Sequence, residues 1–187
     1  MDKNLKSYIK VYNRQLESSV CDSVVDELKI VNWKPHTFYN YTTDSYYTNT
    51  SEPFSYFGSI NHYDTLMKTI YNVLHRYVFE DINFKFYSGW NGYSNIKFNK
   101  YMEGCSMTEH CDHIHEIFDG EKKGIPVLTV IGLLNDDYQG GELVLLEDEL
   151  YCLNKGDIIV FPSLFLYPHK VNTVTNGTRY SFTSWAH

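Results

Sequence analysis

The residues of this chain that are best suited to chemistry are two histidines and an aspartate. His110 and Asp112 are separated by one residue, so on an extended backbone their side chains project from the same face. His169, in the segment Tyr-Pro-His-Lys, supplies a second imidazole. Two imidazoles and one carboxylate leave coordination positions open on Fe(II), as non-haem oxygen chemistry requires. The three residues therefore form a candidate metal site.

A His-x-Asp pair alone is a weak indication of metal binding, because such pairs also arise by chance on solvated loops. A basic residue near the distal histidine strengthens the case. On an extended segment Arg179 shares its face with Ser181, Thr183 and Trp185, which gives a polar, cationic face in an apolar C-terminal hairpin. An arginine in such a pocket can bind a carboxylate through paired hydrogen bonds. The alternative is a surface arginine near a turn.

The elements that must position these residues change character along the chain. Apolar residues first recur at helical spacing over about residues 18–33 and again over about 61–78. From residue 82 onward the spacing becomes that of strands separated by turn residues. The N-cap candidates are Ser18 or Ser19 for the first helix and Asn61 or Asp64 for the second.

Regular short strands predict a mainly β member of the α+β class, with a double-stranded β-helix (jelly roll) and the N-terminal helices packed on the outside of one sheet. We expect one domain over residues 1–187, in which residues 1–94 support a jelly-roll core at 95–187 that contains the metal site. The predicted strands cover about residues 5–14, 82–86, 95–101, 127–134, 143–146, 157–161, 167–174 and 178–185.

Further residues stand at fixed distances from the candidate site. A tyrosine lies nine residues before the first histidine, an arginine ten after the distal one, and a tryptophan six after that arginine. The full set is Tyr101, His110, Asp112, Gly140-Gly141-Glu142, Gly156-Asp157, Phe161-Pro162, His169, Gly177-Thr178-Arg179 and Trp185. This set resembles Fe(II)- and 2-oxoglutarate-dependent dioxygenases, in particular the prolyl 4-hydroxylase-like branch with its short bacterial and phage-encoded members.

The resemblance implies a role for each residue. His110, Asp112 and His169 would hold Fe(II) and form the catalytic centre. Other residues would bind the distal carboxylate of 2-oxoglutarate, and Trp185 would be a further cofactor-binding residue. The resemblance assigns that carboxylate to Arg179, Tyr101 and Thr129. O2 is the second co-substrate, ascorbate an auxiliary reductant, and succinate and CO2 are released as a C–H bond is hydroxylated.

The branch suggests a prolyl residue of a peptide or protein as the substrate. The aromatic residues of segments 39–47 and 54–57 either form a groove suited to a polyproline II ligand or pack in the core. Two alternatives stay open. The same chemistry can act on a free amino acid or another small metabolite, or the chain is a catalytically silent jelly roll that binds a metal or another ligand.

Charge and composition disfavour other partners. The net charge of −7 opposes a broad nucleic-acid surface, and Trp185 stands where nucleic-acid demethylases of this superfamily have a second arginine. The N-terminus lacks an apolar signal core, no stretch approaches the length of a membrane span, and the four cysteines lack a disulfide spacing. We therefore expect a cytoplasmic protein with reduced thiols, in the host cytoplasm if a virus encodes it.

Two further segments have an open role. His113 and His115 follow the motif, but adjacent residues of a strand point to opposite faces, so a second metal site is not expected there. Contact with substrate or a solvated loop is the prediction for both histidines. Residues 38–59 lack helical spacing and are either a lid over the site or a polar connection.

Overall fold

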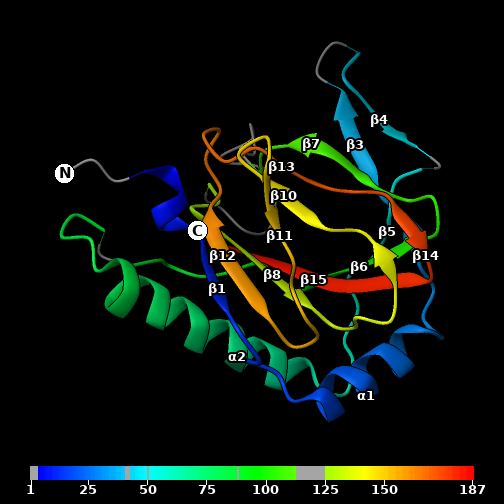
Figure 1. Ribbon diagram of the computed structural model, residues 1–187, viewed down its shortest axis with the longest axis horizontal. Helices are drawn as coiled ribbons and strands as arrows, with labels where there is room; N and C mark the ends of the chain where they lie inside the picture. Colours follow the sequence, from blue (N-terminus) through cyan, green and yellow to red (C-terminus); the bar gives the residue numbers. More distant parts are fainter. Residues whose placement is uncertain (1–3, 41–42, 50, 88, 113–124) are drawn as a thin grey trace.

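The computed structural model describes residues 4–40, 43–49, 51–87, 89–112 and 125–187. Two antiparallel sheets face each other, and two helices cover the outside of the larger one (Figure 1). This arrangement confirms the predicted jelly roll with external helices. In order across the larger sheet, the strands are β1 (Lys10–Tyr12), β12 (Ile158–Pro162), β8 (Leu128–Leu133), β15 (Thr178–Ala186), β6 (Lys97–Met102), β5 (Phe54–Tyr56) and β2 (Lys34–Pro35).

The smaller sheet closes the barrel and carries part of the candidate site. Its strands, in order, are β11 (Glu149–Tyr151), β10 (Leu143–Leu145), β13 (His169–Val171) and β7 (Met107–His110). Two short pairs extend the barrel. They are β9 (Gln139–Gly140) with β14 (Val174–Asn176), and β3 (Thr37–Asn40) with β4 (Ser45–Thr48).

The larger sheet has a separate apolar core on each face. Its outward residues pack against α1 (Ser18–Leu28) and α2 (Tyr63–Arg76), and its inward residues pack against the smaller sheet. Burying one such Leu, Ile or Phe side chain stabilises the fold by about 1.5–3 kcal/mol. The outer core includes Leu28, Ile70, Phe98, Val130, Val160 and Phe182, and the inner core includes Ile131, Leu145, Ile159, Phe161 and Val171.

The helix boundaries differ from those predicted. Glu17 and His62 occupy the N-cap positions of α1 and α2 without a side-chain capping bond, so the predicted serine, asparagine and aspartate caps are wrong. The first helix ends at Leu28, short of residues 31–33. None of the helices in the described residues has the length and apolar character needed to cross a bilayer.

Three predicted strands also differ. The segment 5–14 begins with a 3-10 turn, η1 (Leu5–Tyr8), so only its second part is a strand. The predicted strand at 82–86 is absent, because α2 continues as a π-helix, η2 (Tyr77–Ile82), whose buried Tyr77 hydroxyl donates to the Tyr8 carbonyl at 2.6 Å. The segment 167–174 divides between β13 and β14, which pair with different strands.

The segment predicted as a lid or a connection has two parts. Strands β3 and β4 form a hairpin that projects from the barrel, whereas β5 pairs with β6 in the larger sheet (Figure 1). Residues 41–42 and 50 lie outside the described residues. The second part of the segment is therefore structural.

The outer core predicts the effect of adding a methyl group at Gly132. A Cβ there would lie 2.1 Å from the ring of Phe182, which is fully buried. We expect Gly132→Ala to lower the free energy of unfolding by about 1–3 kcal/mol, as overpacking of a core does. Urea unfolding measures this change. The double variant Gly132→Ala/Phe182→Leu should recover part of the loss, and an unchanged midpoint in Gly132→Ala would contradict the packing described.

Candidate functional site

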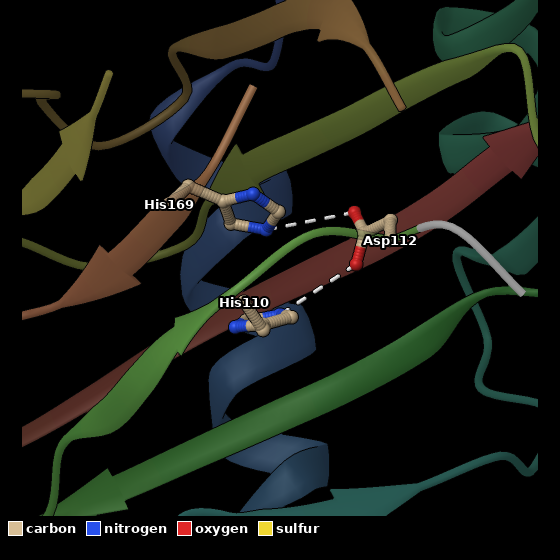
Figure 2. A group of neighbouring side chains, drawn as sticks. All are labelled: His110, Asp112 and His169. Carbon is tan, nitrogen blue, oxygen red and sulfur yellow. Dashed lines mark ion pairs between the residues drawn. The ribbon is translucent and has the colours of Figure 1, made fainter. Parts of the chain in front are cut away.

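Antiparallel pairing in the smaller sheet brings the two predicted histidines together. His110 ends β7 and lies directly opposite His169, the first residue of β13. Their ring centroids are 4.4 Å apart, and both rings point toward Asp112 (Figure 2). Two residues far apart in the sequence therefore become cross-strand neighbours inside the mouth of the barrel.

Asp112 completes the group from the segment that follows β7. Its Oδ1 lies 3.6 Å from Nε2 of His110, and its Oδ2 lies 3.5 Å from Nε2 of His169. The three ligating atoms lie within 4.8 Å of one another. The two separations of 3.6 and 3.5 Å are within the roughly 4.2 Å that two metal–ligand bonds of about 2.1 Å can span. The structure thus places all three predicted metal ligands in one cluster.

Hydrogen bonds hold each of the three side chains in a ligating orientation. Nδ1 of His110 lies 2.7 Å from the Thr108 carbonyl oxygen, and Nδ1 of His169 lies 3.2 Å from the Tyr167 carbonyl oxygen. A carbonyl only accepts, so each Nδ1 carries the proton and each Nε2 lone pair faces the cluster. The Thr129 hydroxyl donates to Asp112 Oδ2 at 2.7 Å.

Burial and charge set the protonation states. Burial favours the neutral form of Asp112, but the neighbouring imidazoles outweigh it and hold the pKa of this carboxyl well below its usual range. Burial lowers the pKa of His169 in spite of Asp112. Burial also lowers the pKa of His110, but the hydrogen bond with Asp112 outweighs burial. The pKa of His110 is therefore raised. An ionised carboxylate and a neutral imidazole are the forms that a divalent cation binds.

A buried cation lies farther inside the barrel. Arg179 is 2% exposed, pairs in register with Tyr101 of β6, and lies 5.0 Å from the centroid of that ring. Its Nη1 donates to Ser181 at 2.9 Å, whereas its Nε has no hydrogen-bond partner and it forms no ion pair among the described residues. A buried guanidinium without an anion is costly, so this position suits the carboxylate of a ligand.

Thr129 does not lie where the resemblance implied. Thr129 pairs with Trp185. Trp185 lies six residues beyond Arg179 along β15, and six residues of extended strand span about 20 Å. Its hydroxyl contacts Asp112 and Ser163 at the metal end of the site. The indole nitrogen of Trp185 is buried without a hydrogen-bond partner among the described residues, and Trp185 helps to lower the Asp112 pKa. Thr129 and Trp185 therefore border the metal cluster.

The structure also adds residues that the sequence did not single out. Ser163 contacts Thr129 at 2.8 Å, and Lys97 lies on the inward face of β6, on the same face as Tyr101. The alternation of Ile96 and Phe98 with polar neighbours was a signal for Lys97, whereas nothing local marked Ser163. His113 and His115 lie outside the described residues.

Comparisons with known proteins agree with this geometry. Residues 96–187 match the family model of the 2OG-Fe(II) oxygenase superfamily. A PKHD-type hydroxylase of Delftia acidovorans is 38% identical over 100 residues, which is 49% of this chain and 42% of that protein. Another, from Crocosphaera subtropica, is 44% identical over 98 residues, 50% of this chain and 42% of that protein. The matched segment thus covers less than half the length of these relatives.

Solved structures share the fold at low identity. A viral collagen prolyl hydroxylase of Paramecium bursaria Chlorella virus-1 gives a TM-score of 0.66 at 17% identity, covering 96% of this chain and 94% of that one. A prolyl hydroxylase of Trichoplax adhaerens, in complex with a hypoxia-inducible factor peptide fragment, gives 0.72 at 15% identity, covering 96% and 83%. Residues 96–187 of this chain therefore match the 2OG-Fe(II) oxygenase family model, and the chain shares the fold of the solved prolyl hydroxylases.

Proposed function

We propose that this chain is an Fe(II)- and 2-oxoglutarate-dependent dioxygenase whose iron is held by His110, Asp112 and His169. The observation that carries the proposal is the convergence of these three ligating atoms. Hydrogen bonds to Thr108, Tyr167 and Thr129 keep the ligands in place. The helices and the barrel, residues 1–187, act as one oxygenase domain in this proposal.

The remaining residues bind the co-substrate and keep water out. Arg179 and Tyr101 hold the distal carboxylate of 2-oxoglutarate, because the guanidinium is buried there without an anion. With both cofactors bound, 2-oxoglutarate and O2 yield succinate and CO2, and the second oxygen atom enters a C–H bond of the substrate. The apolar inner core around Phe161 shields the ligands from solvent.

The substrate in this proposal is a prolyl residue of a peptide or protein. The prolyl hydroxylase neighbours support it, one of which was solved with a peptide. The exposure of the three proposed metal ligands indicates the side from which the substrate approaches the site. The side chain of His110 is 32% exposed, whereas those of Asp112 and His169 are 9% and 5% exposed. The reacting residue therefore approaches from the side of His110.

Removing the carboxylate ligand tests the metal assignment. We expect Asp112→Ala to reduce succinate formation from 2-oxoglutarate to the level without protein, because two imidazoles alone hold the metal poorly and leave it misplaced. Turnover is measured with added Fe(II), ascorbate and proline-rich peptides. The control is Asp26→Ala on α1, whose exposed carboxylate pairs with Lys29 just after the helix; this variant should keep full activity. Unchanged turnover in Asp112→Ala would rule out this metal site.

Removing the buried cation tests the co-substrate site. Arg179→Met should weaken 2-oxoglutarate binding by roughly 10- to 100-fold, the expected loss for hydrogen bonds to a charged group. Anaerobic calorimetry with the metal-loaded protein measures the Kd. Metal affinity should stay the same, because Arg179 does not contact the metal cluster among the described contacts. Equal 2-oxoglutarate affinity in the variant would place the carboxylate elsewhere.

The position of Thr129 predicts a supporting role for its hydroxyl. Thr129→Val keeps the shape of the side chain and removes the bond to Asp112 Oδ2, so metal affinity should fall by about 10- to 100-fold, as when an outer hydrogen bond to a ligand is lost. The matched control is Thr183→Val, on the same face of the sheet, whose hydroxyl contacts Asn99 instead. If both variants bind the metal equally well, Thr129 has no such role.

A further inference from the structure

A second buried cation, Lys97, lies on the inner face of the larger sheet at the metal end. It belongs to β6, opposite Thr183 of β15, four residues from Tyr101 on the same face. Its ammonium lies 5.9 Å from the centroid of the Trp185 ring, and Trp185 pairs with Thr129, whose hydroxyl donates to Asp112. Lys97 therefore lies beside the metal ligands, away from Arg179, which already provides a cation for 2-oxoglutarate.

A cavity of about 600 Å³ opens at this position. Its wall comes from β2, β3, β4, β5, β6 and β15, and residue 57 follows β5. Among the described residues, no aspartate or glutamate lines it, although the chain as a whole has a net charge of −7. The residues that matter here are Lys34, His36, Ser55, Phe57, Lys97 and Trp185.

The direct contacts of Lys97 are with neutral groups, and Asp112 acts on its charge only at longer range. The ammonium lies 3.2 Å from Nδ1 of His36 and 5.9 Å from the centroid of the Trp185 ring, and it forms no ion pair with a carboxylate among the described residues. Burial, followed by the charge of Lys97, lowers the pKa of His36 to about 3, so its ring is neutral and accepts from the ammonium. A buried ammonium with only neutral partners is costly.

The position of the cavity relates it to the reaction. Trp185 contributes to its wall and also lies opposite Thr129, which contacts Asp112. Lys97 also lines the cavity, with its ammonium 5.9 Å from the centroid of the Trp185 ring. A group bound at Lys97 would thus be a near neighbour of the reacting carbon.

We propose that the substrate carries an anionic group that Lys97 binds in this cavity, next to the residue that is hydroxylated. The inference rests on the proposed function and narrows its substrate class to acidic peptides or proteins. Lys97 supplies the charge, Lys34 at the rim adds to it, and Trp185 and Phe57 contact the apolar part of the ligand. The anion is a carboxylate of an acidic side chain, a chain-terminal carboxylate or a phosphate.

Direct binding of matched peptides tests this inference without relying on turnover. The probes are fluorescent proline-containing peptides that carry aspartate, phosphoserine or a free C-terminal carboxylate near the proline, each paired with its asparagine, serine or amidated form. Anisotropy is measured with the protein loaded with Zn(II), which has no redox chemistry, and 2-oxoglutarate. At least one anionic peptide should bind about tenfold tighter than its neutral partner, as expected for a charged hydrogen bond.

Three variants assign that preference to Lys97. Lys97→Met should make the members of each pair bind equally, and Lys97→Arg should keep the preference. Lys100→Met removes the same charge from the opposite face of β6, where the ammonium lies over Trp33, and should also keep it. A preference that is absent in the wild-type protein, or that survives Lys97→Met, would overturn the inference.

The Fe(II)-loaded protein separates this inference from the proposed function. Preferential binding that depends on Lys97, without any hydroxylated peptide, would uphold the anion site and contradict the proposed reaction. Succinate formation that requires Asp112 while none of the peptides binds would uphold the oxygenase and overturn the anion site.

Discussion

The pairing of β7 with β13 is the constraint on which the site depends. It places His110 and His169 opposite each other on two adjacent strands, where side chains stand about 5 Å apart. A shift of this register by one residue would turn one imidazole out of the barrel. The cores on both faces of the larger sheet support the barrel mouth in which this pair meets.

The sequence alone predicted many of the side chains on the inward face of the sheet, because the alternation of side chains along a strand is a local property. Arg179, Ser181, Thr183 and Trp185 were expected to share a face, and the pairing of β15 with β6 and β8 confirms it. The strand predicted over about residues 127–134 is β8, and each of its residues is buried. Such patterns need no knowledge of what lies across the sheet.

The errors concern contacts between distant parts of the chain. Thr129 meets Asp112 because of how β8 faces the segment after β7, which no spacing along the chain encodes. Tyr77, where α2 continues as η2, donates its hydroxyl to the carbonyl of Tyr8, 69 residues earlier in the chain. Lys97 stands in an alternating segment, but its neighbour His36 comes from the edge of the sheet, far away in the sequence.

The two-sided packing of the larger sheet has a consequence for how substitutions act. On β6, β8, β12 and β15 the outer-core residues have even numbers, such as Phe98, Val130 and Phe182, and the inner-face residues have odd numbers, such as Thr129 and Arg179. Substitutions at even positions therefore change the packing against the helices, whereas substitutions at odd positions change the face that carries the candidate site. In these four strands, neighbouring residues can thus alter stability and ligand selectivity separately during evolution.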